Sequence, residues 1–284
     1  MRVKAAMQSL IRTIGKTKEL DPAAEKLSGW VDEATRSPAV KNALSGAWLG
    51  HQVHPMLTDL PIGAWGAATV LDLTGADPAA ARRLVGLGIL ASAPTAAAGA
   101  SDWSTTIGAA KRVGLVHAAA NATASVLQIT SWLLRRRGHH GAGKALSLLG
   151  LGLTLGSSYL GGHLSFVRGT GVNHTAFQPA VRRWTDVGAD ADLAEGARTR
   201  VMVGDVPVLL VRLDSRLHAI SAVCTHAGGP LDEGELGADG CITCPWHGSR
   251  FRIDDGEVRR GPASVPQPCW EAKVEDGRIL LRSA

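Results

Sequence analysis

Two short stretches near the end of the chain each combine a cysteine with a histidine. They read Cys224-Thr-His226 and Cys244-Pro-Trp-His247, and seventeen residues separate His226 from Cys244. Thiolates and imidazoles are the donors that proteins use to hold zinc and iron–sulfur clusters. The spacing therefore predicts a metal centre held by these two cysteines and two histidines.

The distribution of donor types between the two stretches favours one kind of centre. Zinc motifs usually pair like residues, as C-x-x-C or H-x-x-H. Here each stretch supplies one cysteine and one histidine, which suits a two-iron cluster with two thiolates on one iron and two imidazoles on the other. The alternative is a zinc-stabilised binding or sensing module that transfers no electrons.

The elements that must position these residues are short strands. The stretch RVMVGDVPVLLVRLDSRLHAIS, which begins at Arg200, alternates in polarity and is rich in Val, Leu and Ile. Turn pairs at Gly204-Asp205 and Asp214-Ser215 interrupt it. Such patterns are typical of hairpins, so residues 176–284 are predicted to form a small all-β domain.

From Trp184 onward the chain resembles the Rieske iron–sulfur proteins, on the double motif C-x-H and C-P-W-H-G. The resemblance implies a [2Fe-2S] cluster in the 176–284 domain. Cys224 and Cys244 would ligate the inner iron, and His226 and His247 the outer iron.

The same resemblance implies a set of residues around the cluster. Gly261-Pro262-Ala263 matches the loop that covers the cluster, and the Ser249 hydroxyl stands where it can donate to a cluster sulfide. The expected surrounding residues are Gly228, Gly229, Trp246, Gly248, Ser249 and Pro262. Glycine at three of these positions lets the backbone approach the cluster closely.

Departures from the family pattern point to its ferredoxin type. Gly229 and Trp246 stand near the places where the quinol-oxidising members carry disulfide cysteines, and Phe251 replaces a tyrosine of the high-potential members. We therefore expect an intermediate or low reduction potential. Cys241 and Cys269 are expected to be buried free thiols.

The chain is expected to carry electrons without completing a reaction by itself, so no catalytic residues are predicted. Thirty-seven residues follow His247, too few for the mononuclear-iron domain of an oxygenase, and no strand-GxGxxG-helix pattern for a flavin or nicotinamide is present. The expected partner is a ferredoxin reductase, an oxygenase or a quinone.

Four apolar segments occupy the middle of the chain, at residues 56–74, 84–101, 113–134 and 145–167. The last two exceed twenty uncharged residues, enough to cross a hydrocarbon core. We predict a four-helix transmembrane domain over 51–170, preceded by amphipathic helices over 1–50. The alternative is a soluble bundle rich in alanine and glycine.

This region resembles a widespread bacterial four-helix membrane family of unknown function. The resemblance rests on HQVHPMLTDLPIGAW from His51, on DW from Asp102, on HAAAN from His117 and on GGHLSF from Gly161. It implies the topology and no activity. The predicted fold class is thus an all-α transmembrane four-helix bundle followed by a small all-β Rieske-type domain.

Four crossings would gather polar residues at one face of the membrane. The expected set is His51, His54, Asp59, Asp102, His117, Asn121 and His163. Ionisable residues at membrane depth are costly and point to function. Three or four histidines could hold a metal or a haem, or bind a quinone headgroup. The alternative is interfacial side chains satisfied by water and backbone.

The charge distribution bears on partners and location. Residues 58–179 carry 9 Lys and Arg against 4 Asp and Glu, whereas residues 180–284 carry 13 against 16. The acidic half holds the Cys/His motifs, which argues against a nucleic-acid partner and for a lipid bilayer with cationic flanks. We expect a multi-pass protein of the bacterial inner membrane.

The side of the membrane is predicted from two opposing signals. The N-terminus lacks a secretory signal and no disulfide pair is expected, which favours a cytoplasmic β domain. The positive-inside count disagrees, because Arg82, Arg83, Arg135, Arg136, Arg137 and Lys144 would then lie outside. The missing signal decides the prediction, since a long N-terminal tail is hard to export without one.

Overall fold

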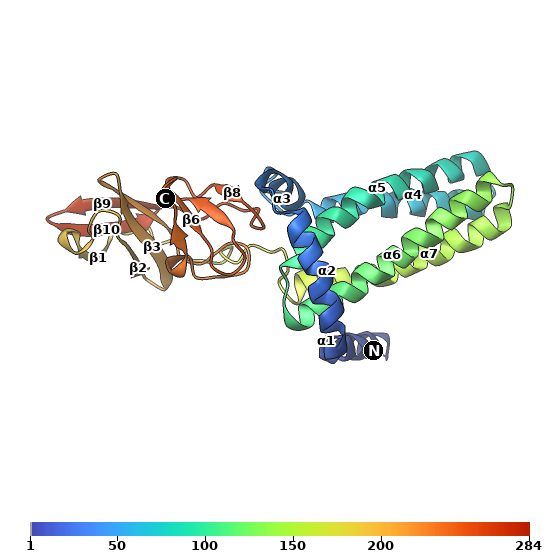
Figure 1. Cartoon of the computed structure of the whole chain (residues 1–284), viewed down its shortest axis with the longest axis horizontal. Helices are drawn as coiled ribbons and strands as arrows, with labels where there is room; N and C mark the ends of the chain where they lie inside the picture. Colours follow the sequence, from blue (N-terminus) through green and yellow to red (C-terminus); the bar gives the residue numbers. More distant parts are fainter. Residues whose placement is uncertain (1) are drawn as a thin grey trace. The chain divides into compact units, whose positions relative to one another are not determined.

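The structure, a computed structural model, describes residues 2–284 and divides into two compact units (Figure 1). The helical unit comprises the chain up to Thr35 together with Val53–Thr170. The β unit comprises Arg36–Gln52 together with Gly171–Ala284. The division differs from the expected domains in one respect, because residues 36–52 pack with the β unit and not with the other N-terminal helices.

The described residues form seven α-helices, four long ones where the bundle was predicted and three shorter ones before them. Their bounds are α1 (Arg2–Lys16), α2 (Asp21–Ala34), α3 (Pro38–Ser45), α4 (His54–Thr74), α5 (Pro78–Ser104), α6 (Gly108–Arg136) and α7 (His140–Phe166). Several starts follow local chemistry. Proline opens α2, α3, α4 and α5, and the Asp77 carboxylate accepts a hydrogen bond from the Ala79 backbone N–H at 2.8 Å.

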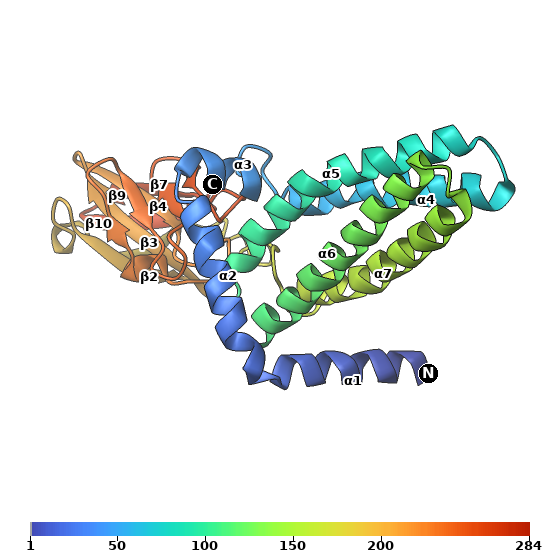
Figure 2. The same ribbon diagram turned by 45° about the vertical axis from the view of Figure 1, so that its right-hand side comes forward.

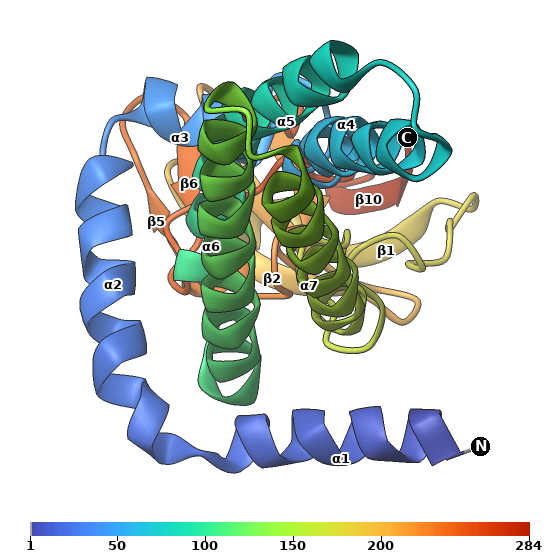
Figure 3. The same cartoon turned by 90° about the vertical axis from the view of Figure 1, so that its right-hand side faces the viewer.

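The four long helices pack as two hairpins, α4 with α5 and α6 with α7, and the hairpins meet through α5–α6 and α4–α7 contacts. Figures 2 and 3 show these two pairs from the side and from one end. Helices α1 and α2 lie against one end of α5 and α6. A two-pronged ion pair at 2.7 Å joins Arg112 to Asp21 there.

Two of the described helices, α5 and α7, are long and apolar enough to cross a membrane. Only 22% and 33% of their most apolar windows are buried, so most of that surface faces outward. A core helix of a soluble protein would show the opposite. Helices α4 and α6 do not pass the same test, so the structure supports two candidate spans and not the four that were expected.

The end of the bundle near the α4–α5 and α6–α7 turns has a polar interior. Arg135 is 1% exposed and forms an ion pair with Asp72 across two helices. The Gln128 amide exchanges hydrogen bonds with Ser147, donating to its carbonyl at 3.0 Å and accepting from its hydroxyl at 2.9 Å. Each buried polar group is therefore satisfied within the bundle.

The β unit contains three small antiparallel sheets. In order along each sheet they are β1-β10-β9, β2-β3-β4 and β5-β6-β7-β8. The strands are β1 (Thr185–Ala189), β2 (Arg198–Val203), β3 (Val206–Leu213), β4 (Arg216–Ser221), β5 (Glu235–Leu236), β6 (Cys241–Thr243), β7 (Arg250–Arg252), β8 (Val258–Arg260), β9 (Trp270–Glu275) and β10 (Arg278–Ser283). This confirms the predicted all-β domain.

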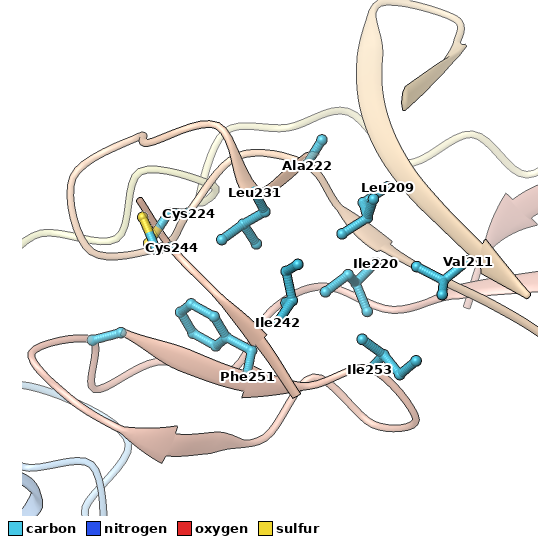
Figure 4. Packing of buried hydrophobic residues seen from close by; sticks show 11 residues of the cluster. Leu209, Val211, Ile220, Ala222, Cys224, Leu231, Ile242, Cys244, Phe251 and Ile253 are labelled. Atoms are coloured by element: carbon cyan, nitrogen blue, oxygen red, sulfur yellow. The ribbon is translucent and has the colours of Figure 1, made fainter. Parts of the chain in front are cut away.

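Two separate cores fill this unit. One packs Val206, Val208 and Leu210 of β3 against Ile279 and Leu281 of β10. The other runs from the opposite face of β3 to the two motif cysteines, as Figure 4 shows. Strand β3 serves both cores because its successive side chains point to opposite faces. The second core is the platform on which the Cys/His loops stand.

Candidate metal centre in the β unit

The two Cys/His loops have the same backbone design. The first follows β4 and is closed by Cys224 N–H to the Gly229 carbonyl at 2.8 Å and by Gly228 N–H to the Cys224 carbonyl at 2.9 Å. The second follows β6 and repeats both bonds, from Cys244 to Ser249 at 2.8 Å and from Gly248 back to Cys244 at 3.0 Å. The two loops therefore have matching backbone hydrogen bonds, and each presents one cysteine and one histidine.

Glycine is required at the turn of each loop. Gly228 has φ +78° and Gly248 has φ +69°, in the left-handed region that L side chains rarely adopt. Gly229 is required for space, because a Cβ there would lie 2.8 Å from the Cys244 sulfur. The glycines predicted from the motif are therefore explained by geometry.

The two sulfurs lie side by side at the end of the core (Figure 4). Both cysteines are buried and neither forms a disulfide. The close approach of the two sulfurs lowers the pKa of Cys244 to about 6 and raises the pKa of Cys224. Two backbone N–H groups of its own loop also point at each sulfur. The loops are thus built to stabilise thiolate charge.

The two histidines form a second pair beside the sulfurs. Their ring centroids are 4.9 Å apart and the rings are nearly perpendicular, at 82°. Burial, together with His247, Lys41 and His174, lowers the pKa of His226 to about 3. His226 therefore carries the neutral imidazole that metal ligation requires.

The donor arrangement fits a two-iron cluster better than a zinc ion. The Nδ1 atoms of His226 and His247 are buried and make no hydrogen bond within residues 2–284. Among those same described residues, no three His, Cys, Asp or Glu side chains converge closely enough to hold one metal ion. A tetrahedral zinc site needs four donors around one point. A thiolate pair beside an imidazole pair instead matches two irons with separate ligand pairs.

A third loop, Gly261-Pro262-Ala263, lies against the two ligand loops. The Ser249 hydroxyl accepts a hydrogen bond from the Ala263 backbone N–H at 3.0 Å, and the Thr225 hydroxyl donates to the Val265 carbonyl at 2.8 Å. Ser249 is fully buried and retains its own hydroxyl proton for donation. Ser249 and Pro262 therefore lie beside each other at the ligand loops, and their place around a cluster stays a prediction.

Sequence reasoning missed the role of the segment 36–52. The side-chain amide of Asn42 in α3 donates to the Arg259 carbonyl at 3.1 Å and accepts from the Gly261 backbone N–H at 2.8 Å. Gln52 donates to the Pro262 carbonyl at 3.4 Å. We call residues 36–52 the clasp. No pattern could have revealed it, because its partners lie about 200 positions away in the chain.

Charged and aromatic side chains also surround the histidine pair. Lys41 of the clasp is 3% exposed and within electrostatic range of His226. His174 bonds through its backbone N–H to the Thr225 carbonyl and lies beside Gly228. Trp246 is 57% exposed, with its ring 6.4 Å from that of His247.

The polar set predicted at the membrane face is divided by the structure. His54, His117 and Asn121 lie inside the helical unit, and Asn121 donates to the His117 carbonyl and to the Ser157 hydroxyl, both at 3.0 Å. His51 lies in the clasp, which packs within the β unit.

The remaining members of that set differ in exposure and partners. Asp59 is exposed, Asp102 is half-buried near the end of α5, and His163 accepts a hydrogen bond from Arg168 at 3.3 Å. That the set forms one site stays a prediction.

Comparison with known proteins assigns both halves of the chain. Residues 183–271 match the Rieske [2Fe-2S] domain, and residues 50–174 match the family described as predicted membrane protein (DUF2231). The chain therefore combines a Rieske domain, which implies a [2Fe-2S] cluster, with a domain of that membrane-protein family.

Three relatives of the Rieske domain are electron carriers or subunits of electron-transfer complexes. Ferredoxin CarAc of Metapseudomonas resinovorans is 34% identical over 99 residues, which are 34% of this chain and 92% of that protein. The alkene monooxygenase ferredoxin component of Xanthobacter autotrophicus is 37% identical over 98 residues, 34% of this chain and 80% of that protein. The cytochrome b6-f complex iron-sulfur subunit of Chlorobaculum tepidum is 34% identical over 98 residues, 34% of this chain and 52% of that protein.

Proposed function

We propose that this protein is a membrane-anchored Rieske iron–sulfur protein that carries single electrons between a redox partner and an acceptor. The observation that carries the proposal is the pair of equal loops, which places two thiolates beside two imidazoles at the end of one core. When bound, the [2Fe-2S] cluster supplies a reversible one-electron couple.

The chain's own residues would do three things for that couple. Cys224 and Cys244 would hold the inner iron, and the backbone N–H groups directed at their sulfurs would offset its negative charge. His226 and His247 would hold the outer iron. The exposed Trp246 ring beside His247 supports docking of a partner at this end of the β unit.

The kind of redox partner is proposed from the names of the similar proteins. Two of the relatives are named as ferredoxins, one of them a component of an alkene monooxygenase system, and the third is named as a subunit of a cytochrome complex. We therefore infer a ferredoxin reductase, an oxygenase or the quinone pool as the partner. The absence of a disulfide among the described cysteines supports a cytoplasmic β unit.

We propose that the helical unit spans the bacterial inner membrane more than once. The two outward-facing apolar helices α5 and α7 and the match to a predicted membrane-protein family support this placement. A second candidate function is that the helices themselves hold a redox group, haem or quinone. The half-buried imidazoles of His54 and His117, each bonded to a backbone carbonyl, favour it.

Low-temperature EPR of the detergent-purified protein, with iron and zinc assayed on the same sample, tests the proposal. We expect about two irons per chain and a rhombic signal that appears only on reduction with dithionite. A fully metallated sample that contains zinc and gives no signal would overturn electron transfer and establish the zinc-stabilised alternative.

A further inference from the structure

Two histidines in the helical unit are held in the same way on different helices. His54 opens α4 and its Nδ1 lies 2.9 Å from the Thr95 carbonyl of α5. His117 lies in α6 and its Nδ1 is 2.9 Å from the Ser157 carbonyl of α7. Each hairpin of the bundle therefore contributes one imidazole, bonded to the backbone of the other helix in its hairpin.

A glycine one turn further along makes each of these bonds sterically feasible. A Cβ at Gly99, four residues after Thr95, would lie 2.6 Å from the His54 ring. A Cβ at Gly161, four residues after Ser157, would lie 3.2 Å from the His117 ring. A hydroxyl residue followed four positions later by glycine thus occurs twice. One imidazole packs against each of these pairs.

The carbonyl bonds fix which ring nitrogen carries the proton. A carbonyl oxygen only accepts, so in the neutral ring Nδ1 is the donor and Nε2 keeps its lone pair. This is the tautomer found in metal-bound histidines, whose other nitrogen is held by a carbonyl or carboxylate. Nε2 is therefore the ring nitrogen with the lone pair in both residues, and in His117 it lies 3.3 Å from the Asn121 side-chain amide, which a metal ligand would have to displace.

The number of protein ligands available indicates which kind of metal group could bind. A mononuclear site without a macrocycle takes at least three protein ligands, and no such group of His, Cys, Asp or Glu occurs among residues 2–284. A porphyrin supplies four nitrogens of its own, so two imidazoles complete its iron. A quinone carbonyl needs a hydrogen-bond donor, which Nε2 in this tautomer is not.

We propose that His54 and His117 are the axial ligands of one haem bound between the two hairpins. This inference rests on the proposal that the helical unit holds a redox group, and it names that group. The matching arrangement of the two rings, one in each hairpin and each packed against a glycine, supports a shared ligand.

The test uses the full chain purified in detergent from cells supplied with a haem precursor, followed by titration with haemin. We expect about one haem per chain with the spectrum of low-spin, bis-histidine iron. His54→Ala and His117→Ala should each lower haem occupancy about tenfold or more, or leave high-spin iron. His163→Ala is the matched control and should bind haem as the wild type does.

A Rieske EPR signal recorded on the same samples helps to distinguish the absence of a haem site from misfolding of the chain. This signal reports the β unit, and far-UV circular dichroism of the same samples reports the helical unit. The haem content of a variant that keeps both signals reports the site alone. Haem absent from the wild type after titration, a co-purifying quinone in its place, or haem unaffected by both alanine variants would overturn the inference. A haem protein without the Rieske signal would instead overturn the proposed electron carrier and leave the haem site standing.

Discussion

At the scale of single residues, the β unit is specified by a small number of positions that geometry makes irreplaceable. Cys224, His226, Cys244 and His247 supply the donors, and the glycines beside them supply the space and the left-handed backbone. Ser249 differs from these, because it holds the third loop through its oxygen and keeps its proton for the cluster. Substitution of each kind of residue is therefore expected to affect the cluster in a different way.

Gly229→Ala should prevent cluster assembly. The added Cβ would lie 2.8 Å from the Cys244 sulfur and 3.0 Å from the Trp246 ring, so one ligand loop must move. We expect iron per chain to fall well below that of the wild type, measured by metal analysis of purified protein. Gly29→Ala, where nothing lies within 4 Å of the added Cβ, is the control. A fully loaded Gly229→Ala protein would contradict this account of the glycine.

Ser249→Ala should lower the reduction potential without loss of the cluster. The hydroxyl can donate to the cluster, and a hydrogen bond to a charged group stabilises the reduced, more negative state. Loss of a tenfold factor in the one-electron equilibrium corresponds to about 60 mV, and we expect a decrease of roughly this size. An EPR-monitored redox titration measures it, with Ser215→Ala, at an exposed turn, as the control. An unchanged potential would show that the Ser249 proton points elsewhere.

At the scale of elements, the clasp shows how a distant segment can complete a site. Helix α3 is only eight residues long, too short to be stable alone, and Asn42 fixes it to β8 and the Gly261 loop. Its packing places Lys41, a buried cation, in the electrostatic surroundings of His226. A buried positive charge favours the reduced state of a nearby cluster.

Lys41→Met should therefore lower the reduction potential. Methionine keeps the apolar stem and removes the charge, so the clasp should remain docked. We expect a decrease of about 60 mV, a tenfold change in the one-electron equilibrium constant, in the same redox titration. Lys26→Met, at an exposed lysine of α2, should leave the potential unchanged. Equal potentials for both variants would exclude a tuning role for Lys41.

Removal of the cluster should loosen one half of the β unit more than the other. The core that ends at Cys224 and Cys244 lies directly beneath the cluster loops, whereas the core between β3 and β10 contains no ligand. After iron removal, hydrogen exchange should increase in both ligand loops and in Gly261–Ala263, while the β9–β10 hairpin keeps its protection. Uniform loss of protection would show that the two cores unfold as one.

At the scale of the whole molecule, the helical unit combines an apolar outside with a polar inside. The outer faces of α5 and α7 carry exposed leucines such as Leu87, Leu90, Leu148 and Leu155. Inside, the pair of Arg135 and Asp72 closes one end of the bundle, and His54 and His117 lie toward the other. This distribution is the reverse of that in a soluble bundle and suits a lipid surroundings.

Asp72→Asn should destabilise the helical unit strongly. The change leaves Arg135 buried and without its counter-charge, which typically costs about 3 kcal/mol or more of unfolding free energy. Thermal unfolding in detergent, followed by far-UV circular dichroism, should show a clear decrease in midpoint. Asp59→Asn, at an exposed position in the same helix, should unfold like the wild type. Similar midpoints for the two variants would contradict a structural role for the ion pair.

The two Cys/His loops can be predicted from the amino-acid sequence alone, because they are local motifs whose chemistry follows from residue type and short spacing. The sequence also determined the β-strands of the second half and the positions of the long helices, since alternation and apolar run length are read along the chain. These local patterns do not depend on which helices and strands pack against each other in the folded chain.

Which distant residues become neighbours can be seen only in the folded chain. There residues 36–52 pack with the β unit, Asn42 bonds to Gly261, and His54 and His117 each bond to the other helix of their hairpin. These outcomes depend on packing between segments that lie far apart in the chain. Gly99 contacts His54, Gly161 contacts His117, and Lys41 is buried near His226. These roles cannot be predicted from the sequence, because each pair is brought together only by the packing of separate helices and loops.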